Sequence, residues 1–349
     1  MSSRLAPPRV PSGNVAVQAP PEIEAADGGS SMLTSMLPML GSVGAIIMVS
    51  VSNAGPTGWL TGGMFLVSAL GFVFVNGWRQ RAQRQATILG NRREYLAYLT
   101  ELRQTVRTAA KAQRRERNWR YPAPETLSYL VEDGTRVWER DATDDDHLTV
   151  RIGTSEQPLC LRLEAPELPP IAQLDPVATT AAHRFIATHE NQPELPTFLR
   201  LSSHTSVQIV GDDLEHIRGL ARSLVTHLAT MQSPEELLIV VAASPDSLPH
   251  WEWAKWLPHA QSPRLRDSLG PARMIGSDTA TLLGMLPASL RERPRFVLGA
   301  PVTAPHVLVI VDGAKVSPTD PAFAGGLQGV TVLDLPSSRD DNDDPSVVR

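Results

Sequence analysis

The pattern of apolar and polar positions divides this chain into an early stretch without charges and a longer part in which charged and apolar residues alternate. Residues 28–78 contain no Asp, Glu, Lys, Arg or His. Two apolar blocks lie inside this stretch, at 32–51 and 59–78, and the turn formers at 52–58 separate them. Each block has about 20 residues, the length that an α-helix needs to cross a hydrocarbon core of roughly 30 Å. The pattern therefore predicts a membrane-spanning helical hairpin.

The stretch that follows is strongly basic and favours a helix. Residues 79–120 carry twelve Lys and Arg against three Glu, and no Pro occurs until Pro122. Because basic residues beside a span stay on the cytoplasmic side, we expect a multi-pass protein of the plasma membrane with both termini in the cytoplasm. The helix also carries apolar residues at the spacing of a heptad seam: Tyr95, Leu99, Leu102, Val106 and Ala109. Two interpretations stay open, a coiled coil and a helix packed on its own domain.

From residue 198 the pattern becomes strand, helix, strand. Amphipathic helices are predicted at 213–230 and 279–293. An unbroken apolar run, typical of a strand covered on both faces, occurs at 237–243, and further strands rich in apolar residues are predicted at 206–210, 306–312 and 330–335. This alternation predicts an α/β domain with a mostly parallel sheet flanked by helices. Before it, 147–153 and 158–164 alternate like two strands of a hairpin or small sheet.

Charge and cysteine content narrow the chemistry only slightly. The net charge is −5, and the single cysteine, Cys160, lies in an apolar alternation, where a small core residue is expected rather than a nucleophile. One cysteine forms no intramolecular disulfide, which fits a reducing compartment. The acidic run at 144–146 predicts a solvated turn rather than a metal site, because no matching ligand set lies nearby.

A phosphate-binding loop is the first chemistry to test, since a strand, a glycine and a helix follow one another here. The motif G-x-x-x-x-G-K-[ST] uses glycines to bring the backbone to phosphate, Lys to contact the outer phosphates and Ser or Thr to hold Mg²⁺. If Gly211 is the first glycine, then His216, Ile217 and Arg218 occupy the remaining positions. None of the three is the residue that the motif requires.

Carboxylates near this loop also depart from an active ATPase. Asp212 and Asp213 can cap the helix and would repel phosphate from its N-terminus. Asp312 ends an apolar strand as a Walker B aspartate does, but Gly313 follows in place of the carboxylate that would orient water. We therefore predict a degenerate P-loop, ATPase-like domain with vestigial positions Gly211 and Asp312. It has no catalytic residue, no metal site and no cofactor of its own.

A tryptophan-rich loop is the most distinctive feature of the α/β part. Trp251, Trp253 and Trp256 occur within six residues. Aromatic clusters of this kind anchor protein interfaces. A role in the core of the domain is equally compatible with the sequence.

In their order along the chain, these segments resemble the N-terminal part of the EccC family, the membrane-bound ATPases of type VII (ESX) secretion systems. The resemblance rests on the early hairpin and on five further segments: RREYLAYLTELR, RFIATHENQPELPTFLRL, VQIVGDD, WEWAKWLPHA and HVLVIVDGA. The resemblance implies a membrane anchor, a stalk and a degenerate ATPase-like domain. It also implies later FtsK/SpoIIIE-type modules that use ATP and Mg²⁺ to export small helical proteins. This sequence holds no Walker A motif, as expected of a truncated chain or a split gene product.

Five segments are expected from these patterns. They are a disordered tail at 1–30, the transmembrane hairpin at 31–78, a basic helical stalk at 79–120, the ATPase-like domain at 121–336 and a disordered acidic end at 337–349.

The predicted function is to couple the cytoplasmic motor modules of a type VII secretion ATPase to the secretion channel. Its expected partners are other membrane subunits of the complex, the downstream ATPase modules, the lipid bilayer and further copies of the chain. Two alternatives remain, an ATP-hydrolysing enzyme and a DNA-translocating FtsK-type fragment. The basic helix could contact nucleic acid phosphates, but its expected place against the bilayer argues against that.

Overall fold

The computed structural model describes residues 4–23, 56–168, 170, 173–301, 303–317, 319–335 and 347–348. Two compact units share the chain. Unit 1 comprises Met1–Val10, Ala112–Gln157 and Pro193–Arg349, and unit 2 comprises Pro11–Lys111 and Pro158–Gln192.

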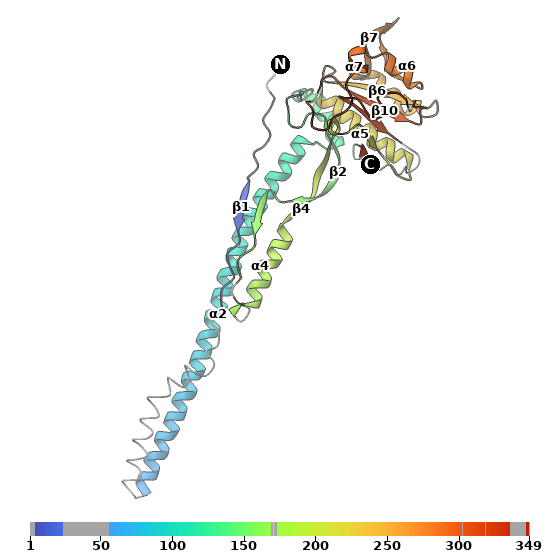
Figure 1. The fold of residues 1–349 in the computed structure, drawn as a ribbon. Helices are drawn as coiled ribbons and strands as arrows, with labels where there is room; N and C mark the ends of the chain where they lie inside the picture. The colour runs from blue at the N-terminus through green and yellow to red at the C-terminus, as the bar shows by residue number, and fades with distance from the viewer. Residues whose placement is uncertain are drawn as a thin grey trace. The chain divides into compact units, whose positions relative to one another are not determined.

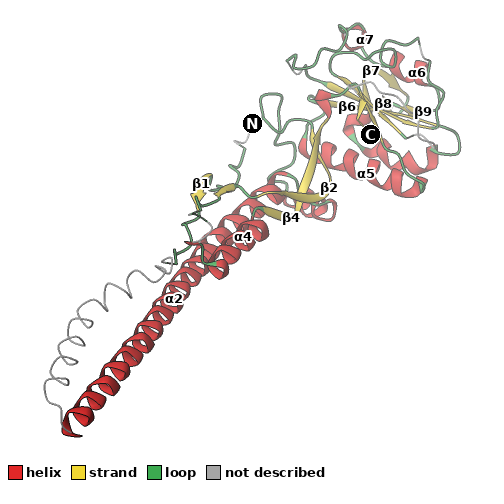
Figure 2. Ribbon diagram, turned by 60° about the horizontal axis from the view of Figure 1, so that its bottom comes forward, coloured by secondary structure: helices red, strands yellow, loops and turns green. Residues whose placement is uncertain are grey.

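Unit 1 is built on a parallel sheet of six strands (Figures 1 and 2). Its strands stand in the order β12, β5, β11, β10, β6 and β9, and every neighbouring pair is parallel. Their bounds are Val347–Val348 (β12), Ser206–Gln208 (β5), Val330–Asp334 (β11), His306–Asp312 (β10), Leu237–Ala243 (β6) and Ile275–Gly276 (β9). The α/β part of the predicted fold is confirmed.

Helices cover both faces of this sheet. Helix α5 (Leu214–Met231) packs its apolar stripe on one face together with the tryptophan-rich 3₁₀ helix η4 (Leu248–Trp256). Helices α6 (Thr279–Gly284) and α7 (Ala288–Arg291) cover the other face. Every residue of β6 and β10 is buried, which explains why β6 is entirely apolar and why β10 is apolar between His306 and Asp312.

The rest of unit 1 surrounds this sheet with short elements. A short 3₁₀ helix η1 (Pro124–Thr126) leads into α3 (Leu127–Asp133), which ends at Gly134 in a left-handed conformation with φ of 69°. A second 3₁₀ helix, η3 (Leu201–Ser203), precedes β5, and η5 (Pro258–Ala260) leads into the antiparallel hairpin of β7 (Gln261–Asp267) and β8 (Gly270–Arg273).

The two strands predicted upstream of the sheet do not form a hairpin with each other. Strand β2 (Thr149–Pro158) pairs with β4 (Asn191–Arg200), and β3 (Leu161–Glu164) pairs in parallel with β1 (Gly13–Ala16). Only Leu159 and Cys160 separate β2 from β3, and neither is a residue that a tight hairpin turn favours.

Unit 2 packs one face of a long helix against a short one. Helix α2 (Pro56–Arg120) is continuous over 65 residues, and α4 (Pro176–His189) begins at Asp175, whose side chain caps it. The predicted seam residues are buried with Ala178, Ala182 and Phe185 of α4 and with Val17 near the N-terminus. The structure thus assigns the seam to packing within its own unit. Residues 13–16, inside the predicted tail, form β1.

One finding contradicts the predicted membrane-spanning hairpin. Among the described residues, no helix has both the length and the apolar character that a bilayer span requires. Residues 59–78, the predicted second span, belong to α2, which runs on without a break through the basic stretch. The predicted first span, 32–51, lies outside the described residues. The multi-pass location in the plasma membrane, which rested on this hairpin, is corrected with it.

Candidate functional site

The candidate site lies at the carboxyl ends of β5 and β10, where parallel α/β sheets usually bind ligands. Gly211 lies in the connection from β5 to α5, and Asp312 is the last residue of β10. The strand β11 stands between β5 and β10, so the two predicted positions are two strands apart. The residues from α5 and from the loop after β6 that face Asp312 determine what this edge can hold.

Arg218 of α5 and Asp312 form a two-point ion pair, which we call the Arg218–Asp312 lock. Arg218 Nε donates to Asp312 Oδ2 at 2.8 Å, and Arg218 Nη2 donates to Asp312 Oδ1 at 3.1 Å. The side chain of Asp312 is 2% exposed and that of Arg218 is 11% exposed. This fork geometry is the strongest that an arginine and a carboxylate adopt, and it uses both oxygens of Asp312.

Side chains that follow β6 form further hydrogen bonds with the two residues of the lock. The indole nitrogen of buried Trp251 donates to Asp312 Oδ2 at 2.9 Å. Arg218 Nη2 also donates to Ser247 Oγ at 2.8 Å, and Ser244 Oγ donates to Ser247 Oγ at 3.0 Å. Asp312 therefore accepts three hydrogen bonds from two side chains, which satisfies a buried carboxylate without any ligand from outside the chain.

Asp312 is a charged carboxylate at neutral pH. Burial acts to raise its pKa, but the hydrogen bonds from Arg218 and Trp251 and the nearby positive charge outweigh burial, and the pKa lies below its usual value. The hydrogen bond to Asp312 in turn raises the pKa of Arg218. Each partner thus keeps the other ionised.

Acidic side chains lie at the N-terminus of α5, the end of a helix at which a phosphate can bind. Asp213 Oδ1 accepts from the amide of Glu215 at 2.9 Å and caps the helix. Glu215, in the first turn, pairs with Arg222, and His216 pairs with Asp213 at 2.7 Å on the surface. A phosphate approaching these amides would meet two carboxylates.

Gly211 and Gly313 differ in what the backbone requires of them. A Cβ at Gly211 would meet only ordinary contacts, with Ile217 at 3.6 Å, and its backbone is not left-handed. Gly313 has a φ of 69°, and a Cβ there would lie 3.4 Å from Ser244 Oγ. The backbone at position 211 does not require a glycine, whereas the residue after Asp312 does.

ATP with Mg²⁺ does not fit these residues. The position of the Mg²⁺-binding hydroxyl holds Arg218, and the Walker B position holds a carboxylate with both oxygens already bonded. The lysine position holds Ile217, which is 4% exposed in the core. No group of three or more metal-ligating side chains occurs in the described part of the chain.

The chain is similar in sequence to several known proteins that share one family name. It is 33% identical over 347 residues to the ESX secretion system protein EccC of Thermomonospora curvata. The aligned residues make up 99% of this chain and 26% of that protein. It is also 34% identical over 350 residues to the ESX-4 secretion system protein EccC4 of Mycobacterium tuberculosis. The ESX-3 protein EccC3 of the same species is 30% identical over 342 residues. No family model matches the chain.

The chain belongs to the EccC family of ESX secretion systems. It spans about a quarter of the length of the curated EccC relatives it matches. The resemblance stated from the sequence is confirmed at the level of this family.

The three tryptophans of the tryptophan-rich loop differ in burial. Trp251 is fully buried and Trp253 stacks on it with ring centroids 6.4 Å apart, whereas Trp256 is 78% exposed. Sequence reasoning missed Trp251 as a partner of Asp312 and Ser247 as a partner of Arg218. The only available signal was the position of this loop after a buried strand, at the same edge as Asp312.

The acidic run at 144–146 is a turn, as the sequence predicted, and Asp145 is exposed, but the prediction of a solvated side chain is wrong for Asp146. Asp146 is 1% exposed and accepts from Arg4 Nη2 at 2.6 Å, and buried Arg140 lies 3.6 Å away. Its pKa is raised by burial but lowered further by Arg4 and Arg140, so the carboxylate stays charged. Asp146 is therefore a structural ion-pair centre.

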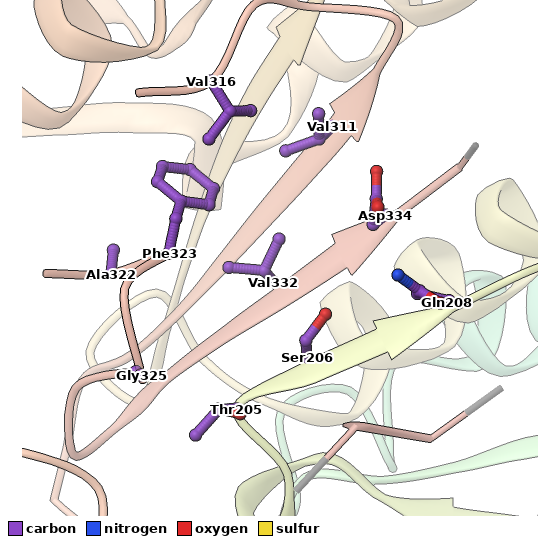
Figure 3. A pocket seen from close by; sticks show the side chains of 11 residues that line it. Thr205, Ser206, Gln208, Val311, Val316, Ala322, Phe323, Gly325, Val332 and Asp334 are labelled. Carbon is purple, nitrogen blue, oxygen red and sulfur yellow. The ribbon is translucent and has the colours of Figure 1, made fainter. Parts of the chain in front are cut away.

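A cavity of about 260 Å³ opens on the opposite face of the sheet (Figure 3). Val311 and Val332 project into it from β10 and β11, Phe323 comes from the connection between these strands, and Ser206 and Asp334 lie at its polar side. Val311 and Asp312 face opposite sides of β10, so the cavity is separate from the lock.

Proposed function

We propose that unit 1 is a non-hydrolysing, ATPase-like domain that couples the motor modules of an ESX secretion ATPase to the rest of the secretion complex. The observation that carries this proposal is the Arg218–Asp312 lock. Its guanidinium supplies, from within the chain, the positive charge that Mg²⁺ supplies in a working P-loop enzyme. The relatives are named as proteins of ESX secretion systems, which supports a place beside other subunits of such a complex.

The lock argues against hydrolysis by this domain itself. For Mg²⁺ to reach Asp312, the carboxylate would have to exchange three hydrogen bonds, two of them charged, for the metal. The missing lysine and the acids at the start of α5 would weaken the grip on the phosphates further. Such a domain transmits a conformational state and leaves chemistry to other modules.

The test separates a structural lock from a catalytic aspartate. Arg218→Met with Asp312→Leu removes both charges and keeps similar volumes, whereas Asp312→Leu alone leaves a buried arginine unpaired. In a strain whose ESX secretion depends on this protein, we expect export to persist in the double variant and to fall in the single one. MgATP titration by calorimetry should show no binding to the wild-type chain.

Two results would overturn the proposal. One is ATP hydrolysis by the purified chain that disappears in the double variant. The other is loss of secretion in the double variant while its unfolding free energy matches that of the wild type.

A further inference from the structure

The hairpin of β7 and β8 stands apart from the six-stranded sheet. It is a sheet of its own, with Gln261 opposite Arg273 and Asp267 opposite Gly270, and Figure 1 shows it projecting from the body of unit 1. The register shifts between Gln261 and Arg266, so β7 carries a bulge. Bulges of this kind re-aim the side chains that follow them.

The bulge is fixed by contacts with the end of α6. Ser262 Oγ accepts from the amides of Arg264 and Leu265 at 3.3 and 3.0 Å and donates to the carbonyl of Met285 at 2.9 Å. Arg264 Nη2 donates to the carbonyl of Gly284 at 3.0 Å. The hairpin is thus anchored at its base to the end of α6.

Two leucines on this hairpin lie exposed. Leu269 is 97% exposed at the tip, where Asp267 Oδ1 accepts from its amide at 2.8 Å and fixes the turn. Leu265 is 38% exposed. The turn depends on the Asp267 side chain and on Gly270 with its φ of 142°, so nothing in the local fold requires a leucine at position 269.

Arginines surround these leucines without acidic partners. Arg264, Arg266 and Arg273 are exposed, and none of them forms an ion pair with a carboxylate of the described residues. The one acid of the hairpin, Asp267, is engaged in the turn. In a chain of net charge −5, this is a local positive surface with an apolar tip.

We propose that this hairpin is a docking arm for a protein partner that presents acidic side chains around a small apolar depression. Arginine is enriched in protein interfaces, and an exposed leucine that enters a pocket excludes water at the centre of the contact. The unpaired charges speed encounter with an acidic surface. An arm of this size buries little area, so the contact is a transient one.

A defined probe tests this on the full chain. The probe is a labelled helical peptide with Glu along one face and Leu along the other, and its control carries Lys at every Glu position. Fluorescence anisotropy at about 50 and about 300 mM salt should show binding of the acidic peptide that weakens with salt, and no binding of the basic one.

Matched charge reversals locate the contact. We expect Arg266→Glu with Arg273→Glu to weaken binding at least about tenfold, because two attractions become repulsions. The same change of charge at exposed Arg81 and Arg84 of α2 should leave affinity unchanged. Leu269→Ser should weaken binding without altering its salt dependence.

Three outcomes would overturn the proposal. They are failure of the wild type to bind the acidic peptide, equal binding by the two double variants, and binding to anionic lipid vesicles, lost on reversal of Arg266 and Arg273, in the absence of peptide binding. The last would assign the arm to a lipid surface. Thermal unfolding of each variant checks that the fold is retained.

Discussion

Arg218 and Asp312 form a buried two-point ion pair at the carboxyl edge of the parallel sheet. The guanidinium contacts both carboxylate oxygens, at 2.8 and 3.1 Å, and Arg218 occupies the position that the motif reserves for the hydroxyl. On the proposed P-loop correspondence, the arginine at this position both replaces the hydroxyl ligand and supplies the charge that the metal would bring.

Breaking this lock from one side should be costly. Arg218→Met leaves Asp312 buried and unpaired, and we expect the free energy of unfolding to fall by about 3–5 kcal/mol in urea denaturation. Arg222→Met, which breaks an exposed pair with Glu215 on the same helix, should cost no more than about 1 kcal/mol. Equal losses in the two variants would contradict a buried lock.

The indole hydrogen bond should be separable from the bulk of the ring. Trp251→Phe keeps most of the buried volume but removes the donor to Asp312, and we expect a loss of about 1.5–3 kcal/mol in unfolding free energy. Trp256→Phe, at a side chain that is 78% exposed, provides the control and should change stability by less than about 0.5 kcal/mol. A null effect of Trp251→Phe would mean that the hydrogen bond adds nothing to the lock.

Buried histidines should make unit 1 sensitive to acid. Burial lowers the pKa of His306 to about 3, and its ring contacts Thr331 Oγ1 at 3.0 Å. Because the unfolded chain binds this proton near pH 6.5 and the folded chain does not, stability is complete above that pH and falls as pH drops from 6.5 towards 3.

For His306 alone the loss between pH 7.5 and pH 5 is about 2 kcal/mol in unfolding free energy. His306→Gln should flatten this slope, whereas His183→Gln, at an exposed position on α4, should leave it as in the wild type. An unchanged slope in His306→Gln would show that the ring is not the group that titrates.

Packing of α4 on α2 should tolerate no extra volume at its centre. Ala182 is fully buried among seam residues such as Leu99 and Val106, so Ala182→Leu should cost about 1–3 kcal/mol. Ala187→Leu on the exposed side of the same helix should be neutral within about 0.5 kcal/mol. Hydrogen exchange of α4 amides reports on this unit directly, and equal protection in both variants would refute the assigned contact.

Local patterns predicted the α/β core well, because each strand carries its own signal. The apolar runs of β6 and β10 are buried along their whole length, and Asp213 caps α5 as its position suggested. The heptad spacing identified the buried face of α2 but not what covers it. A periodic stripe reports that a face is apolar, and it carries no information on whether a second copy or its own unit packs there.

Local sequence patterns could not identify contacts between residues that are far apart in the sequence. Trp251 and Asp312 are 61 positions apart, and their hydrogen bond depends on η4 folding back over the sheet edge. Asp146 looked like part of a solvated acidic run because its partner Arg4 lies 142 positions away. The charge-free stretch misled in a different way: its lack of charge at 59–78 indicated a span, yet no helix of the described residues has the length and apolar character that a span requires.

A cation that is part of the polypeptide has properties that a dissolved ion lacks. It cannot be chelated, diluted or exchanged for another metal, and its local concentration is the same in every growth condition. The positive charge that faces Asp312 therefore does not depend on the free magnesium of the cell. On the proposed function, a change in the state of this domain has to reach it through the chain or through another protein.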